Sequence, residues 1–401
     1  MRTLTHSIGL LIALGAVAVS GAALAQSWGP RNLEELKEET LNRTRSGWRG
    51  IKPEDAERAV ADLDALDPDV WAAAWSRIGE EYLARAVELE PSSFEQAREN
   101  YYHAWRNFNM GRWPTEKQSA GKRQAYESAL EAFQHYGRLL DPPIETVRIP
   151  FEGTELVAYL RLPEGVGPAP LVFALNGIDS RKEDVIVNVD AFINNGVGVF
   201  AIDMPGTGQA PILADIGAER MYSRALDYLE TRSDVDASRI VVQGRSWSGY
   251  WAAVLAYTER DRIRGASLSG ATVHDFFQPE WLEKTLATPE YLFDLLPARA
   301  AIYGVKTMEE YLAYSPRMSL VARGLIDQPS APMLLIAGEQ DTQQPISDLY
   351  LLMKHGDPKL VWVNPEGGHG ADSERYSSGW IRENVIQPWL LGQLGATARA
   401  R

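Results

Sequence analysis

The chain has 401 residues, of which 45% are hydrophobic and 23% charged, and its formal net charge is −14. This composition is typical of a globular protein with one large domain and a smaller one, and the acidic balance without a basic block disfavours nucleic-acid binding. The chain contains no cysteine, which excludes disulfides, thiolate metal sites and a cysteine nucleophile.

The first 25 residues have the pattern of a secretory signal peptide. Arg2 precedes an apolar run over residues 8–19, and Ala23 and Ala25 place small side chains at the two positions that determine cleavage. We therefore expect cleavage after Ala25, a periplasmic or secreted protein, and no stable membrane association afterwards. A retained membrane anchor is the alternative. Export without cysteine suits a bacterial periplasm, where a free thiol is a liability.

Residues 26–143 are predicted to form a helical region. Apolar side chains recur at helical spacing, as in Ile78, Tyr82, Ala86 and Leu89, and breaks are expected at residues 91–93 and 111–114. The region is also rich in aromatic residues: Trp71, Trp75, Tyr101, Tyr102, Trp105, Phe108 and Trp113. Such a stripe favours packing between helices over a ligand cage.

Residues 144–401 have the pattern of an α/β domain. Two alternating segments, 144–153 and 155–163, predict an antiparallel hairpin. Six short apolar runs then follow, at residues 170–176, 196–203, 239–244, 263–269, 331–338 and 359–364. Runs of this kind, separated by helical patterns, predict a doubly wound, mostly parallel sheet, with a helical insertion over residues 271–328. Ligands bind such sheets at the carboxyl ends of the strands.

A candidate nucleophile lies at the end of one of these strands. Ser246 comes just after the run "IVVQG" and before the helical "GYWAAVLA", the strand–turn–helix context of a nucleophile elbow. The usual pattern is Gly-x-Ser-x-Gly; here Gly244 is present, Ser248 replaces the second glycine, and Gly249 follows. Centring the motif on Ser248 would put the large Tyr250 at a position that needs a small residue. Ser246 is therefore the predicted nucleophile.

An acid and a histidine follow in the chain order of α/β-hydrolases. Asp341 lies after the strand "APMLLIAG", with Glu339 as the backup acid, and His369 lies after the strand "KLVWVN". In such a triad the acid orients the imidazole, which takes the serine proton. An oxyanion hole needs two backbone N–H groups, and we expect them from Trp247 and from Gly177 or Ile178.

Other polar residues have weaker patterns. His274, at the start of the insertion, is a candidate for substrate contact, whereas His355 is expected on the surface and Asp203 in a structural turn. The six histidines have no metal-binding spacing, so neither a metal nor another cofactor is predicted.

Longer segments resemble a known family. They are "NYYHAWRNFNMGRWP", "AYESALEAFQHYGRLLDPPIETVRIPFEGTELVAYLRLP", "NGIDSRKED", "DYLETRSDVDASRIVVQGRSWSGY" and the loops of Asp341 and His369. Together, over residues 95–390, they resemble the 2,6-dihydroxypseudooxynicotine hydrolase-like group, which includes fermentation-respiration switch type esterases and fungal pigment hydrolases. The resemblance implies an α/β-hydrolase fold whose N-terminal helices cap the active site. It also implies a Ser246–Asp341–His369 triad, with Ile178 and Trp247 at the oxyanion hole.

The chain departs from this family in three respects. Some members carry an acidic residue in the segment matching "GIDSRKED" that assists carbon–carbon bond cleavage, and Asp179 stands there, one carbon shorter than the family's Glu. Ser248 replaces the usual glycine of the elbow, and this chain has an export signal where its relatives are largely cytoplasmic.

The sequence thus predicts an exported serine hydrolase that cleaves an ester of a small, apolar or aromatic substrate. Two alternatives stay open: a hydrolase of carbon–carbon bonds next to a ketone, and a catalytically silent binding protein of the same fold. The sequence leaves open whether the chain forms a homodimer.

Overall fold

The computed structural model describes residues 32–45, 47–165, 167–286, 292, 296–355 and 358–396. The predicted signal peptide at residues 1–25 lies outside them. Among the helices of the described part of the chain, none combines the length and the apolar character needed to span a bilayer.

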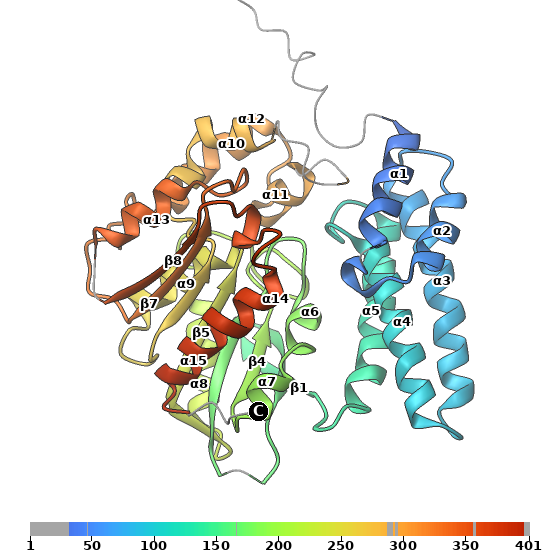
Figure 1. The fold of residues 1–401 in the computed structure, drawn as a ribbon, viewed down its shortest axis with the longest axis horizontal. Helices are drawn as coiled ribbons and strands as arrows, with labels where there is room; N and C mark the ends of the chain where they lie inside the picture. Colours follow the sequence, from blue (N-terminus) through green and yellow to red (C-terminus); the bar gives the residue numbers. More distant parts are fainter. Residues whose placement is uncertain are drawn as a thin grey trace, which may run out of the picture.

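The body of the molecule is an eight-stranded sheet in the order β1-β2-β4-β3-β5-β6-β7-β8 (Figure 1). The strands are β1 (Glu145–Phe151), β2 (Thr154–Arg161), β3 (Ala169–Leu175), β4 (Gly198–Ile202), β5 (Val235–Arg245), β6 (Ala266–Ser269), β7 (Met333–Gly338) and β8 (Lys359–Asn364). β2 is antiparallel to both β1 and β4, and the remaining neighbours are parallel. The predicted fold class, an α/β-hydrolase fold with an N-terminal helical region, is confirmed.

Helices cover both faces of the sheet. Along β3, Leu171 and Phe173 belong to the core on one face, whereas Val172 and Ala174 belong to the core on the other. One face packs against α8 (Arg220–Glu230), α9 (Ser248–Thr258) and α13 (Ile346–Met353), and the other against α6 (Lys182–Ile186), α7 (Asp190–Ile193), α14 (Ser378–Ile381) and α15 (Gln387–Gln393). Because both faces are buried, the central strands are continuously apolar.

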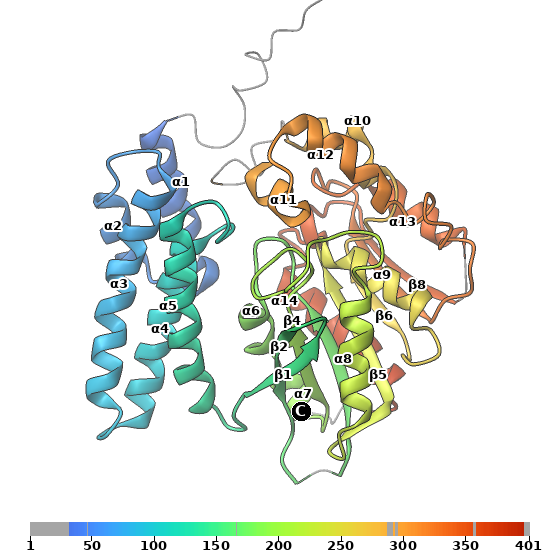
Figure 2. The same ribbon diagram turned by 180° about the vertical axis from the view of Figure 1, so that it is seen from behind.

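The N-terminal region is a bundle of helices beside the sheet (Figures 1 and 2). It consists of α1 (Leu33–Thr44), the short turn η1 (Trp48–Gly50), α2 (Pro53–Ala61), α3 (Pro68–Leu89), α4 (Phe94–Arg112) and α5 (Ala120–Arg138). The break at residues 91–93 is confirmed, because Ser93 caps α4 by accepting a hydrogen bond from the Gln96 N–H. The second expected break is wrong at its start, since α4 continues to Arg112.

The aromatic residues of this region form its core. Trp71, Trp75, Tyr101, Trp105, Phe108 and Trp113 are all at most 1% exposed, as predicted for packing between helices. Phe133 contacts Trp105 within the bundle, with ring centroids 4.9 Å apart, and Tyr159 of β2, at 5.0 Å. Part of the bundle's core, around Trp105 and Phe133, is therefore continuous with the core on one face of the sheet.

Short helices follow β6 and lie over the carboxyl ends of the strands (Figure 1). They are η2 (Asp275–Phe277), α10 (Pro279–Leu286), α11 (Leu296–Tyr303), α12 (Met308–Tyr314) and η3 (Ser315–Met318). Two further short elements, η4 (His369–Ala371) and η5 (Arg382–Ile386), follow β8.

Candidate active site

The turn between β5 and α9 has the geometry of a nucleophile elbow. Ser246 has φ +57°, a left-handed conformation that is strained for a residue with a side chain. An added Cβ on Gly244 would lie 2.2 Å from the Ser248 carbonyl oxygen, and one on Gly249 would lie 1.9 Å from the Gly270 carbonyl oxygen. These two close approaches explain why the turn requires glycine at both positions.

Ser248 is a structural residue of this turn. Its buried hydroxyl accepts a hydrogen bond from the Arg245 N–H at 2.9 Å and lies 2.9 and 3.2 Å from the carbonyl oxygens of Arg245 and Leu175. The hydroxyl is thus hydrogen-bonded to the backbone at the ends of β5 and β3.

The three residues predicted as a triad lie together. His369 Nε2 is 3.0 Å from Ser246 Oγ, and His369 Nδ1 is 3.0 Å from an oxygen of the Asp341 carboxylate. Backbone N–H groups of Gln343 and Gln344 donate to the other Asp341 oxygen, at 2.8 and 3.0 Å. With Nδ1–H donating to Asp341, Nε2 is free to accept the serine proton.

Two backbone N–H groups beside Ser246 are available for an oxyanion. Ile178 and Trp247 line a small cavity next to Ser246, and neither N–H has a hydrogen-bond acceptor among the described residues. The N–H of Gly177, the alternative candidate, donates to Ser180 Oγ at 3.0 Å. Ile178 is therefore the better partner for Trp247, because a side chain already occupies the Gly177 donor.

The weaker candidates lie elsewhere. His274 Nδ1 is 2.7 Å from Ser319 Oγ, and His274 lines neither of the cavities that contain Ser246 among the described residues. Glu339, the backup acid, accepts a hydrogen bond from the Tyr350 hydroxyl at 3.3 Å instead of contacting the imidazole.

Two residues behave as expected of structural positions. His355 is half-buried, and its Nδ1 lies 2.9 Å from an oxygen of the exposed Asp327 carboxylate. The buried Asp203 carboxylate accepts hydrogen bonds from both the backbone N–H and the ammonium of Lys182, each at 2.9 Å.

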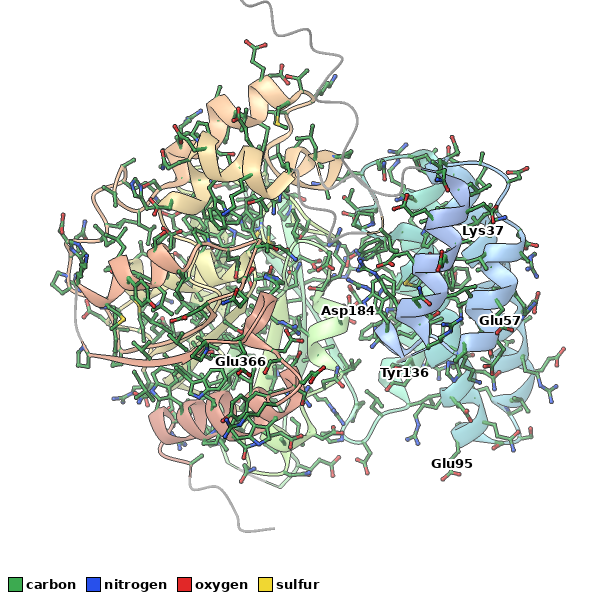
Figure 3. All side chains as sticks on the ribbon, turned by 45° about the horizontal axis from the view of Figure 1, so that its top comes forward. Lys37, Glu57, Glu95, Tyr136, Asp184 and Glu366 are labelled. Carbon is green, nitrogen blue, oxygen red and sulfur yellow. The ribbon has the colours of Figure 1, made fainter. Side chains whose placement is uncertain are left out.

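A cavity of about 510 Å³ lies between the helical region and the body, with Ser246 and His369 in its wall. The helical region contributes Trp48, Arg49 and Arg106. The body contributes apolar residues and the carboxylates of Asp179 and Asp184, and Figure 3 shows Asp184 between the two regions. We call this side of the site the cap-side wall.

Asp179 is held by the helical region. Arg49 Nη2 lies 2.5 Å from its carboxylate, and the Trp113 indole N–H donates to the same oxygen at 3.4 Å. Burial acts to raise the pKa of Asp179, but the guanidiniums of Arg49 and Arg112 outweigh it and hold the pKa below its ordinary value. Asp179 is therefore ionised at neutral pH.

Asp184 is the centre of a second contact between the regions, which the sequence does not reveal. It accepts hydrogen bonds from Arg106 (2.7 Å), Asn109 (3.1 Å) and Arg112 (3.4 Å) of α4, and from the Arg181 backbone N–H (3.0 Å). Burial opposes ionisation, yet Arg106 and Arg112 outweigh it and lower the pKa of Asp184. The cap-side charges are thus paired with one another.

A second cavity, of about 10 Å³, lies next to the elbow, and we call its lining the insertion-side wall. It consists of Ile178, Ser246, Trp247, Phe276, Arg299, Gln343, Gln344 and His369. Arg299 and Gln344 were missed by sequence reasoning. The signal for Arg299 was a lone charge in the apolar helix "LPARAAIY".

No group of histidine and acidic side chains in the described part of the chain has the arrangement of a metal site. The residues at Ser246 are instead a hydroxyl, an imidazole and a carboxylate in series, which suits nucleophilic attack on a carbonyl carbon.

Known proteins are similar to this chain in sequence. The chain matches the family described as "Esterase FrsA-like" over residues 67–365. It is 26% identical over 349 residues to Esterase FrsA of Vibrio vulnificus (strain YJ016), covering 79% of this chain and 81% of the relative. It is 24% identical over 369 residues to Esterase FrsA of Citrobacter koseri, covering 86% and 88%.

Two solved structures share the architecture. The 2,6-dihydroxy-pseudo-oxynicotine hydrolase aligns with a TM-score of 0.71 at 21% identity, covering 88% of this chain and 96% of that one. AbyA5 aligns with a TM-score of 0.68 at 23% identity, covering 92% and 96%. At these identities the two likenesses establish the fold alone.

Proposed function

The chain belongs to the FrsA-like esterase family, and from this membership we propose that it is a serine hydrolase of carboxylic esters. The observation that carries the proposal is the series Ser246–His369–Asp341, with 3.0 Å at each contact. Its context supports the same role, because Ser246 has the strained left-handed backbone of an elbow.

The proposed reaction has two stages. Ser246 Oγ attacks the ester carbonyl carbon and gives its proton to His369 Nε2. As the tetrahedral intermediate collapses, the carbon–oxygen bond to the alcohol breaks, and the alcohol oxygen takes the proton from Nε2. Water then attacks the acyl-serine and gives a proton to Nε2. That proton returns to Ser246 Oγ as the carboxylic acid leaves.

Two features would lower the barrier of both stages. The N–H groups of Ile178 and Trp247 would donate to the developing oxyanion, and loss of one such donor slows acyl transfer by about 100-fold or more. Asp341 would hold the imidazole in the tautomer that presents a free Nε2, and would stabilise the imidazolium.

We propose a small substrate whose leaving group occupies the large cavity. The buried aromatics of the helical bundle do not line this cavity, apart from its rim at Trp48, so they give no support for an apolar substrate. Support comes instead from Val189, Phe192 and Ile386 in the cavity wall, which favour an apolar leaving group.

Cleavage of a carbon–carbon bond next to a ketone is the second candidate, favoured by Asp179 in the wall of the same cavity. Its lowered pKa makes Asp179 unsuited to donate a proton at neutral pH. An ionised Asp179 would have to act as a base or by its charge.

The test is the intact mass of the protein after exposure to a fluorophosphonate. We expect one adduct on the wild type and on Ser248→Ala, the matched control, and none on Ser246→Ala. After labelling, the rates of hydrolysis of benzyl esters and of a β-diketone are measured, and they distinguish ester hydrolysis from carbon–carbon bond cleavage. An adduct that persists in Ser246→Ala would mean that another residue is the nucleophile. No adduct on a folded wild type would favour a binding protein without catalytic activity.

We also propose export, on the pattern of residues 1–25. Expression of the full chain in a Gram-negative bacterium tests it. We expect a periplasmic protein whose N-terminal sequence starts at Gln26, whereas a cytoplasmic protein that retains Met1 or Arg2 would contradict the proposal.

A further inference from the structure

Arg299 is a buried cation without a counter-ion among the described residues. It lies on α11 and is 2% exposed, and its Nε and Nη1 atoms have no hydrogen-bond partner in that part of the chain. It forms no ion pair with any carboxylate of the described residues. The neighbouring phenol of Tyr311 does not balance the charge, because burial raises its pKa and keeps it neutral. A buried guanidinium without a counter-ion lowers the stability of the fold, so its presence needs an explanation.

The cation stands next to the reacting groups. Arg299 lines the small cavity together with Ser246 and His369. Its guanidinium carbon lies 5.7 Å from the centre of the Phe276 ring, and that ring packs edge-on against the Trp247 indole at 5.0 Å. Trp247 directly follows Ser246. Packing therefore fixes the guanidinium beside the elbow.

A second unsatisfied group faces the same cavity. Gln344 is 6% exposed, and its buried side-chain oxygen has no hydrogen-bond partner among the residues that the structure describes. Its backbone N–H donates to Asp341, so this residue is anchored to the triad. Buried polar atoms of two side chains, in one cavity at the nucleophile, thus have no partner among the described residues, which indicates that a ligand supplies the partners.

We propose that Arg299 binds a carboxylate on the acyl half of the substrate, so that the enzyme prefers half-esters of short dicarboxylic acids. This inference rests on the proposed ester hydrolysis. We assign the small cavity to the acyl half because the oxyanion donors Ile178 and Trp247 line it and because the leaving group is proposed to occupy the large cavity.

The size of the cavity restricts the anion. About 10 Å³ is close to the space of one water molecule, and the oxyanion donors line the same cavity, so it must widen at Arg299 to admit a carboxylate and suits only a short acyl group. A planar carboxylate matches the guanidinium fork and needs less room than a phosphate. Malonyl, with one methylene between its two carbonyl carbons, is a short acyl group that carries such a charge.

The test compares two esters of the same alcohol, benzyl hydrogen malonate and benzyl 3-methylbutanoate, whose acyl groups differ in a carboxylate against an isopropyl group. We expect the wild type to have a kcat/KM about 10- to 100-fold higher for the malonate, the range for a hydrogen bond to a charged group. Arg299→Met should lower kcat/KM for the malonate by about tenfold or more relative to the neutral ester and so remove this preference, and Arg299→Lys should keep part of it.

Arg317→Met is the matched control, since Arg317 is an exposed arginine on the same insertion. It should change neither rate. A wild type without the preference, or an Arg299→Met variant that slows both esters equally, would overturn the inference; the second result would assign Arg299 to the oxyanion or to packing.

A wild-type measurement covers the case that Arg299→Met does not fold. At constant ionic strength, malonate should inhibit hydrolysis of the neutral ester competitively and slow fluorophosphonate labelling of Ser246, and the uncharged malonamide should do neither. Absence of this difference would contradict the inference. Turnover of neither ester, with no labelling of Ser246, would instead refute the proposed function, so the two failures are distinguishable.

Discussion

The two walls of the site differ in whether their charged side chains are paired. On the cap-side wall, Asp179 and Asp184 each contact an arginine of the helical region. On the insertion-side wall, Arg299 has no counter-ion among the described residues. Paired charges fix two parts of a protein in a set arrangement, whereas an unpaired buried charge lowers stability and is retained where a ligand needs it. The paired charges of Asp179 and Asp184 therefore hold the two regions together, whereas the charge of Arg299 is available to a ligand under the inference above.

The cap-side pairs continue away from the cavity. The buried Arg181 contacts the carboxylate of Glu116, which also accepts a hydrogen bond from the Gly208 N–H at 3.0 Å. Burial works against ionisation of Glu116, but Arg181 and Arg112 outweigh it and lower its pKa to about 2. The helical region is therefore attached to the body by buried ion pairs as well as by the shared aromatic core.

The largest expected loss of stability comes from breaking the ion pairs of the cap-side wall. Asp184→Ala leaves Arg106 and Arg112 buried without their carboxylate, and we expect the free energy of unfolding to fall by about 3–5 kcal/mol. Denaturant unfolding monitored by tryptophan fluorescence measures it. Asp62→Ala, which breaks an exposed pair with Arg77, is the control and should cost less than about 1 kcal/mol. Equal losses in the two variants would contradict the contrast between buried and exposed pairs.

The next effect is a pH dependence of stability at Asp348, which holds the backbone of Phe276 in the insertion-side wall. Asp348 accepts hydrogen bonds from the N–H groups of Val273, Asp275 and Phe276, yet burial raises its pKa from 3.8 to about 6. A carboxyl with a raised pKa in the folded state contributes stability fully below pH 3.8, and this contribution is lost as pH rises through about 6.

We therefore expect wild type to gain stability relative to Asp348→Asn as pH falls from 7.5 to 4, by on the order of 2 kcal/mol. Unfolding free energies of both proteins across this range measure the difference. A difference that shrinks as pH falls would show a lowered pKa, as on the cap-side wall.

A smaller effect has the opposite sign to that of Asp184→Ala. Arg299→Met replaces an unpaired buried cation by an apolar side chain of similar length, so the free energy of unfolding should stay the same or rise by about 1–2 kcal/mol. The same denaturant titration measures it, with Arg317→Met as the exposed control. A loss of more than about 2 kcal/mol would mean that Arg299 holds the insertion together.

Local sequence patterns predict most of the fold and the central residues of the site. Six strands could be read from short apolar runs, because both faces of the sheet are buried there, and β1 and β2 could be read from alternation. Ser246, Asp341 and His369 could be found because each follows directly on a strand whose carboxyl end faces the site. Trp247 needs no further information, since it is next to Ser246.

Contacts between distant segments could not be predicted in this way. Arg49 and Asp179 are 130 residues apart, and they meet only because the helical bundle docks on the sheet. The burial of Arg299 depends equally on how the insertion folds over the elbow. For Gly177 the deciding contact is a side chain, Ser180 Oγ, which no strand pattern reveals. The helix starts at Pro53 and Pro68, by contrast, were available from the preference of proline for the first helical turn.

The smallest effect concerns the turn that both walls share. Ser248 and Ser246 are two residues apart, but only the Ser246 hydroxyl contacts His369, while Ser248 Oγ accepts from the Arg245 N–H. Ser248→Ala should therefore lower the free energy of unfolding by about 1 kcal/mol, the net value of one hydrogen bond. It should reduce kcat/KM for benzyl esters by less than about tenfold, because Gly244 and Gly249 still permit the turn. Ser246→Ala, measured alongside, should reduce kcat by about 10⁴-fold or more at unchanged stability. If Ser248→Ala abolished turnover as completely as Ser246→Ala, the second hydroxyl would belong to the chemistry and not to the turn.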